Sequence, residues 1–146
     1  KPGNLGQWGM FEPNPINISR IDHVVIRVAD MPVMIAFYRD VLGCRLERGP
    51  GDLGLAQLRA GDSLIDLVDV SGKLGGTGNA PETSAPNMDH VCLQVQPRDE
   101  AAILRHLEAR GVKPGPVASR NGATGQGPSI YLEDPEGNTV ELKGAA

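Results

Sequence analysis

A chain of 146 residues suits one domain or two closely packed modules, since a unit of about 65 residues would bury only a marginal core by itself. The net charge of −4 and only five aromatic residues argue against a phosphate-tracking surface or a base-stacking platform. No apolar run approaches the roughly 20 residues that span a bilayer, and the first residues lack a signal-type segment. We therefore expect a soluble, cytoplasmic protein without nucleic acid or membrane partners.

Residues 1–17 combine Gly, Asn and Pro without apolar periodicity, which predicts an N-terminal arm. Trp8 and Phe11 are candidate anchors for this arm on a neighbouring subunit. An alternative is that translation begins at Met10 and residues 1–9 are a cloning remnant.

The stretch Ile21–Val28 occurs twice, because Met88–Val95 repeats it 67 residues later. Each copy places one histidine, His23 or His90, at the start of a strand-like run. In the first copy one face is apolar and the other carries a histidine and an arginine, since Asp22, Val24, Ile26 and Val28 alternate with Ile21, His23, Val25 and Arg27. The third histidine, His106, lies in a helical pattern and has no counterpart.

The rest of the first module, residues 18–70, reads as one helix and three strands. Asp30 is a predicted N-cap, Pro32 fits the first helical turn, and Gly43 ends the helix. Apolar residues recur at helical spacing between these limits, namely Met34, Phe37, Tyr38, Val41 and Leu42. Strand candidates follow at 45–48, 55–60 and 63–70, which completes a βαβββ unit.

Residues 71–87 change in composition to Gly, Pro, Ser, Thr and Asn, which predicts a linker. Its glycine-rich part, residues 72–78, resembles a phosphate loop but lacks the G-K-[ST] ending and a following helix. The linker interpretation is therefore favoured.

Module two, residues 88–144, repeats the order. A strand at 88–95 precedes a helix capped at Asp99 and stopped by Gly111, with Ile103, Leu104 and Leu107 facing inward. Strands follow at 116–119, 129–133 and 139–143, the last two joined by the turn Asp134–Asn138. We predict an α+β fold, a single domain over 18–146 in which two tandem βαβββ modules form a cupped eight-stranded mixed sheet.

The two cysteines share no C-x-x-C spacing, so we expect two free thiols. Cys92 lies on the His90 face, and we favour a small core residue over a pocket thiol.

The repeat supplies one imidazole and one carboxylate in each module. In the last strand Glu141 lies opposite the apolar Val140 and Leu142, and aligning the two modules places Asp66 at the same point as Glu141. If the sheets curve around a shared cleft, His23, Asp66, His90 and Glu141 converge on one divalent ion. This mixed N/O set suits Ni, Co, Mn, Fe or Zn with an open position, and a metal-free pocket is the alternative.

The paired D-H-V motifs at His23 and His90, the D-P-x-G-N turn at 134–138 and the V-E-L strand of Glu141 resemble the vicinal oxygen chelate superfamily. That superfamily includes glyoxalase I, fosfomycin-resistance thiol transferases, extradiol dioxygenases, methylmalonyl-CoA epimerase and bleomycin-binding proteins. The resemblance implies paired modules in a homodimer, with a divalent metal that chelates vicinal oxygens of a small-molecule substrate. It matches His23, His90 and Glu141 to metal ligands, while Asp66 is shorter than the usual residue at its position. The ligands can come from one subunit or from two.

Five further polar residues are candidate substrate contacts, each with a plain structural alternative: Arg27, Gln94, Arg120, Tyr131 and Lys143. Arg120 opens a glycine-rich loop and could hold an anionic substrate, or it is simply a surface arginine. Tyr131 shares a face with Ser129, so its hydroxyl either points into the cleft or belongs to an ordinary half-buried tyrosine.

The first functional hypothesis is a metal-dependent lyase or isomerase of glyoxalase I type. It would act through an enediolate-like intermediate, with Glu141 or Asp66 as the catalytic carboxylate that moves the proton. The alternatives are an Fe(II) extradiol-type dioxygenase, thiol transfer to an epoxide antibiotic, and a metal-free drug- or metabolite-binding module of the bleomycin-resistance kind.

Overall fold

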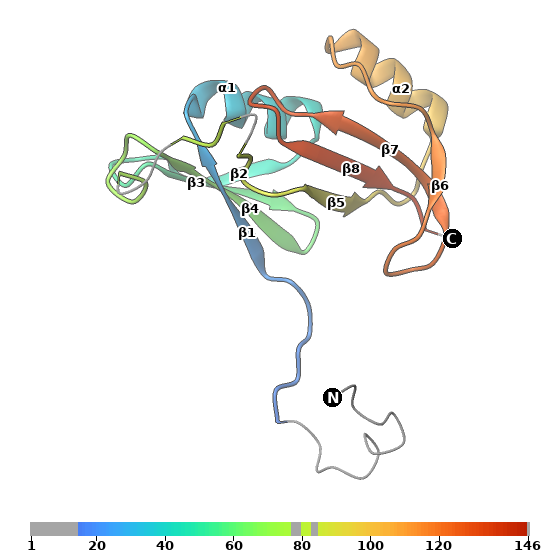
Figure 1. The fold of residues 1–146 in the computed structure, drawn as a ribbon, viewed down its shortest axis with the longest axis horizontal. Helices are drawn as coiled ribbons and strands as arrows, with labels where there is room; N and C mark the ends of the chain where they lie inside the picture. Colours follow the sequence, from blue (N-terminus) through green and yellow to red (C-terminus); the bar gives the residue numbers. More distant parts are fainter. Residues whose placement is uncertain (1–14, 77–79, 83–84, 146) are drawn as a thin grey trace.

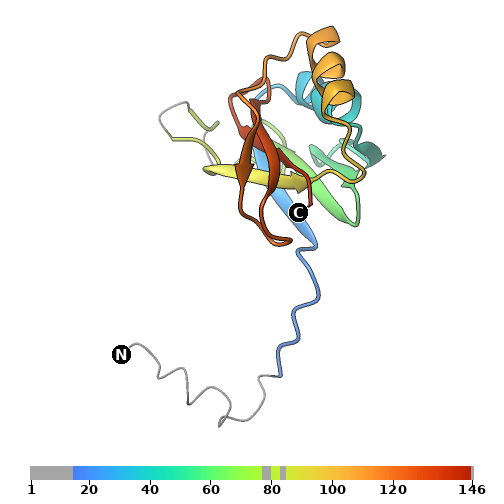
Figure 2. The ribbon, with the colours of Figure 1, turned by 90° about the vertical axis from the view of Figure 1, so that its right-hand side faces the viewer.

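The computed structural model describes residues 15–76, 80–82 and 85–145. Residues 1–14 of the predicted arm, with Trp8 and Phe11, lie outside this range, and residues 15–22 lead away from the strands (Figure 2). The eight strands are β1 His23–Val28, β2 Arg45–Arg48, β3 Leu55–Ala60, β4 Ser63–Asp69, β5 His90–Gln94, β6 Ala118–Arg120, β7 Gly127–Glu133 and β8 Thr139–Lys143. Among the described residues, no helix is long and apolar enough to cross a membrane.

The strands form two four-stranded sheets with the same layout (Figure 1). The first has the order β1-β4-β3-β2 and the second β5-β8-β7-β6. In each sheet the strand that begins with a histidine pairs in parallel with the last strand of its module, and the other pairs are antiparallel. The predicted α+β class and the duplicated βαβββ order are confirmed, with the eight strands of one chain divided between two sheets.

Both predicted helices are present, and the first has an unexpected second half. Asp30 caps α1, Met31–Ala36, by accepting a hydrogen bond from the Val33 amide at 3.1 Å. The chain continues as a π-helical segment, η2, over Phe37–Val41. Periodicity predicts one regular helix here, but the wider turn buries both of the adjacent aromatic residues Phe37 and Tyr38. Helix α2, Glu100–Ala109, is capped by Asp99 as expected.

A single apolar core joins the two modules. It takes Ile26 and Leu67 from the first sheet, Ile130 and Val140 from the second, and Leu107 from α2. Since strand residues alternate between faces, the side of each sheet that does not pack on this core carries the polar residues. We call these the polar faces of module one and module two. Both polar faces are directed away from the shared core.

The D-P-x-G-N turn between β7 and β8 ties the modules together. The Tyr38 hydroxyl of η2 donates to Asp134 Oδ2 at 2.7 Å, and the backbone amides of Glu136 and Asn138 donate to Asp134 Oδ1, each at 2.9 Å. Asp134 is only 4% exposed, so these bonds compensate a buried carboxylate. Burial and the neighbouring Asp134 raise the pKa of Tyr38, which keeps this donor protonated.

Two further contacts of the same turn reach the first module. The Glu136 carboxylate accepts the backbone N–H groups of Ala29 and Asp30 at 2.8 Å. Asn87 donates to the Asn138 side chain at 3.0 Å and exchanges two hydrogen bonds with the backbone of Arg27, both at 3.1 Å. The end of β1, the start of α1 and the end of the linker are thus all fixed to one turn.

We predict that Tyr38→Phe lowers the free energy of unfolding by about 1.5–3 kcal/mol, the usual worth of a hydrogen bond to a charged group. Urea denaturation followed by circular dichroism measures this change. Tyr131→Phe on the polar face of module two is the control, and we expect it to change stability by less than about 0.5 kcal/mol. Equal effects of the two substitutions would contradict the role given to Asp134.

Candidate metal and substrate site

The polar face of module two brings His90 and Glu141 together. His90 Nε2 lies 3.1 Å from Glu141 Oε1, and Ser129 donates to Glu141 Oε2 at 2.7 Å. On its other side, His90 Nδ1 lies 2.6 Å from Asp89 Oδ1. Glu141 is 5% exposed, so a buried carboxylate sits beside a partly exposed imidazole. The Tyr131 ring lies edge-on to His90 at 5.4 Å between centroids and closes one side of this pair.

The polar face of module one carries the equivalent residues, but His23 and Asp66 do not form an ion pair within 4.0 Å. His23 Nδ1 lies 2.7 Å from Asp22 Oδ2, and Asp66 sits on the neighbouring strand β4. The hydrogen bond with Asp22 is the main reason that the pKa of His23 is raised, and the charge of Asp66 acts in the same direction. Register confirms the alignment of the two modules, because Asp66 pairs with Val25 in the first sheet as Glu141 pairs with Cys92 in the second.

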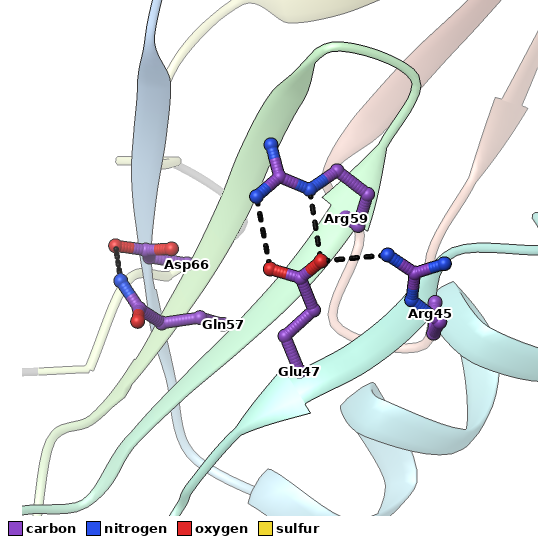
Figure 3. A network of polar contacts seen from close by, with 5 residues as sticks. All are labelled: Arg45, Glu47, Gln57, Arg59 and Asp66. Carbon is purple, nitrogen blue, oxygen red and sulfur yellow. Dashed lines mark hydrogen bonds and ion pairs between the residues drawn. The ribbon is translucent and has the colours of Figure 1, made fainter.

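Asp66 is buried and incompletely hydrogen-bonded. It is 3% exposed, and Gln57 on β3 donates to its Oδ2 at 3.2 Å (Figure 3). Its Oδ1 is buried and has no hydrogen-bond partner among the described residues. A buried carboxylate oxygen without a partner is costly, and such atoms in native folds commonly mark a functional position.

Farther out on module one's polar face, Glu47 accepts hydrogen bonds from Arg59 and Arg45 (Figure 3). These two guanidinium groups lower the pKa of Glu47 to about 2.

Each of these His–carboxylate pairs is half of the predicted ligand set, and one chain does not assemble the whole set. Within the residues that the structure describes, no three His, Cys, Asp or Glu side chains are grouped so that they could hold a metal ion. Both histidines border one groove of about 630 Å³ along β5, but neither Asp66 nor Glu141 lines it. A larger hollow of about 830 Å³ between η2, the end of α2 and the β7–β8 turn contains none of the four predicted ligands.

The sequence-family model of the Glyoxalase/Bleomycin resistance protein/Dioxygenase superfamily matches residues 20–142 of this chain. This span includes both His–carboxylate pairs. The chain belongs to this superfamily. It is 31% identical over 126 residues to virulence protein STM3117 of Salmonella typhimurium, which covers 86% of this chain and 83% of the relative. The crystal structure of that protein has a TM-score of 0.72, with 90% of this chain and 100% of the other covered at 27% identity.

Two other superfamily members show how widely this chain's similarity extends. The mitochondrial methylmalonyl-CoA epimerase of Mus musculus is 28% identical over 145 residues, which is 92% of this chain and 78% of the relative. The fosfomycin resistance protein FosX of Listeria monocytogenes shares the fold, with a TM-score of 0.64 at 20% identity over 89% of this chain and 96% of that chain. The superfamily thus includes enzymes, and membership alone does not fix a reaction.

Among the five candidate substrate residues, Arg120 and Tyr131 are in contact with each other. Arg27 is engaged with the linker, because its guanidinium donates to the Gly75 carbonyl at 2.7 Å. Gln94 is exposed and accepts a hydrogen bond from Thr124 at 3.3 Å. Arg120 lies 4.3 Å above the Tyr131 ring centroid and donates to the Ser129 carbonyl at 2.9 Å. Lys143 is buried.

One sequence prediction about the site is wrong. Cys92 is exposed and is not a core residue, because Val91 and Leu93 form the apolar face of β5 and place Cys92 on the polar face with His90. Partial burial, followed by the charge of Glu141, raises the pKa of its thiol. Both cysteines are free, as predicted, and burial raises the pKa of the other thiol, Cys44, to about 11.

Other residues of the two pairs were not given roles from the sequence. The aspartates that contact the histidines, Asp22 and Asp89, were visible as the repeated D-H dipeptide. Gln57 had no such signal, since its contact with Asp66 depends on the pairing of β3 with β4. Ser129 was placed on the correct face, but only the structure shows that it donates to Glu141.

We predict that one thiol of the native protein reacts with a disulfide reagent at pH 8 and that the second reacts only after unfolding. Cys92 is the exposed thiol, and its raised pKa should make the rate climb as pH approaches and passes 9. Cys92→Ala should remove the fast phase, and Cys44→Ala should retain it. A fast phase that survives Cys92→Ala would contradict the assignment.

Proposed function

We propose that this chain is a divalent-metal-dependent enzyme of glyoxalase I type, a lyase or isomerase that acts on a small substrate with adjacent oxygens. The observation that carries the proposal is the duplicated pair: each module sets one imidazole and one buried carboxylate on its polar face. Similarity to a methylmalonyl-CoA epimerase, whose name denotes inversion of a stereocentre, supports proton-transfer chemistry.

The residues present fit a divalent metal. Asp22 and Asp89 lie against Nδ1 of His23 and His90, which leaves Nε2 of each ring for a ligand bond. Asp66 Oδ1 has no hydrogen-bond partner among the described residues, and Glu141 Oε1 lies beside His90 Nε2. Two imidazole nitrogens and two carboxylate oxygens suit Ni, Co, Mn, Fe or Zn. A metal bound by them would polarise the adjacent oxygens of the substrate as a Lewis acid.

We further propose that the complete site forms between two copies of the chain. His23 and Asp66 of one copy would face His90 and Glu141 of the other. Two observations support this: the polar faces are directed away from the shared core, and β1 and β5 each lie at an edge of their sheet. A twofold dimer would then contain two equivalent sites.

The protein's own contribution to the reaction would be a positioned carboxylate. Asp66 Oδ1 and Glu141 Oε1 are the two candidate atoms to accept a proton from carbon next to a carbonyl and return it. Ser129 holds the second oxygen of Glu141 and so fixes the direction of its carboxylate. Tyr131 lies edge-on to His90, and Arg120 lies over the Tyr131 ring, so both side chains border the His90–Glu141 pair.

An Fe(II) extradiol-type dioxygenase is the second candidate. It would use only His23, His90 and Glu141, and the engagement of Asp66 Oδ2 with Gln57 is compatible with such a three-ligand set. Oxygen consumption that depends on iron would favour this candidate over the lyase or isomerase.

We predict near-stoichiometric Ni, Co, Mn, Fe or Zn in protein purified without chelator or affinity-metal contact, measured by elemental mass spectrometry. The His23→Ala, His90→Ala double variant should lose the metal, because it removes both imidazole ligands. His106→Ala is the matched control, since His106 Nε2 is engaged with the Val41 carbonyl of η2 at 2.8 Å, and it should retain the metal. Wild-type protein that stays metal-free after incubation with added metal would contradict the catalytic proposal and favour a metal-free binding module.

We also predict that Asp66→Asn makes the metal-free protein more stable, because it replaces a buried carboxylate charge, which has no ion-pair partner among the described residues, with a neutral amide. The same variant should lose much of the stabilisation that added metal gives the wild type. Asp134→Asn is the control, and it should destabilise the protein because every bond that Asp134 accepts is in place. Chemical denaturation with and without metal measures both effects. A loss of metal-free stability in Asp66→Asn would contradict the prediction.

A further inference from the structure

Lys143 is a buried cation close in sequence to Glu141, one of the proposed metal ligands. It lies on the polar face of β8, two residues beyond Glu141, and pairs in register with Gln94 of β5 and Ser129 of β7. The residue is only 3% exposed, and its Nζ donates to the Gly144 carbonyl at 3.0 Å.

Within the described part of the chain, Lys143 forms no ion pair, because no carboxylate oxygen there lies within 4.0 Å of its Nζ. The nearby carboxylate of Glu141 is engaged with Ser129 and His90. An ammonium group has three donors, and its burial without a counter-charge is unfavourable. An anionic partner would remove that penalty.

A second cation flanks the same place. The Arg120 guanidinium donates to the carbonyl of Ser129, and Ser129 is the register partner of Lys143. Arg120 and Lys143 therefore lie on β6 and β8, the two strands that flank β7 at Ser129, and Glu141 is the acidic residue of β8 on the same face. The positive charge of the two side chains exceeds the negative charge of this carboxylate.

The backbone at Gly122 packs closely against the side chain of Lys143. A Cβ added at Gly122 would lie 3.0 Å from Lys143 Cε and 3.4 Å from its Nζ, so an alanine there would displace the end of the lysine side chain. On β5, Cys92 and Gln94 flank Lys143 and are exposed. Both residues also line the groove of about 630 Å³, which brings that groove to the strand next to Lys143.

We propose that Lys143, with Arg120 beside it, binds an oxyanion of the substrate, a carboxylate or a phosphoryl group. This inference rests on the proposed function and narrows its substrate class to anionic compounds. Residues i and i+2 of a strand are about 7 Å apart, so the anionic group would lie only a few bonds from the oxygens held near Glu141. The charge-assisted hydrogen bonds of Lys143 would select such substrates over neutral ones.

The test measures binding of inorganic phosphate, and of acetate in a separate series, to metal-free full-length protein at constant ionic strength. Thermal unfolding is followed as the anion concentration rises. We expect a saturable increase in melting temperature for wild type, and apparent affinity weaker by about ten- to a hundredfold in Lys143→Met, as follows from losing a charged hydrogen bond. The stronger of the two anions identifies the chemical class. Lys143→Met without anion should be at least as stable as wild type.

Three further variants serve as controls for the role of Lys143. Lys113→Met removes an exposed lysine and should leave anion binding unchanged. Gly122→Ala crowds the ammonium and should weaken anion binding even where Lys143→Met folds poorly. His90→Ala should lose metal but retain the anion effect, which separates failure of this inference from failure of the proposed function. Wild type that shows no saturable response, or equal responses in wild type, Lys143→Met and Gly122→Ala, would overturn the inference.

Discussion

The buried carboxylate of Asp134 is the contact on which the arrangement of the two modules depends. It accepts the Tyr38 hydroxyl from module one and the backbone amides of its own turn, and Glu136 and Asn138 extend the same turn to β1, α1 and the linker. Because a buried charge must be compensated, these bonds form together with the apolar core. They hold the two sheets with their apolar faces inward, so the polar face of each module is left to bind something else.

Because the apolar faces of both sheets pack inward, each polar face carries one half of the candidate site. Each module presents a histidine that an aspartate contacts at Nδ1 and a buried carboxylate on the same polar face, and both polar faces are directed away from the common core. A chain built this way carries two halves of a ligand set. We propose that a second copy completes the set, and the positive charge of Lys143 and Arg120 would add selection for an anionic substrate.

The sequence predicted what depends on local pattern and on the repeat. Alternation placed His23, Asp66, His90 and Glu141 on polar faces, and the register of β1 with β4 and of β5 with β8 confirms the equivalence of Asp66 and Glu141. Features that depend on long-range pairing were not predicted: the contact of Gln57 with Asp66, the burial of Lys143 under Gly122 and the bond from Tyr38 to Asp134. Cys92 was correctly placed on the His90 face, but the preference for a core residue over a pocket thiol was wrong, because alternation gives the face of a strand residue and not its exposure.

The most direct test of a site shared between two copies is the metal content of a mixed dimer. One variant would carry His23→Ala with Asp66→Asn, and the other His90→Ala with Glu141→Gln, so that neither forms a complete site alone. After unfolding and refolding an equal mixture, random pairing gives one intact site in half of the dimers, or about one quarter of a metal ion per chain. We expect each variant alone to be empty and the mixture to bind metal at this level. A mixture as empty as its parts, beside a metal-loaded wild type, would contradict a site built from two copies.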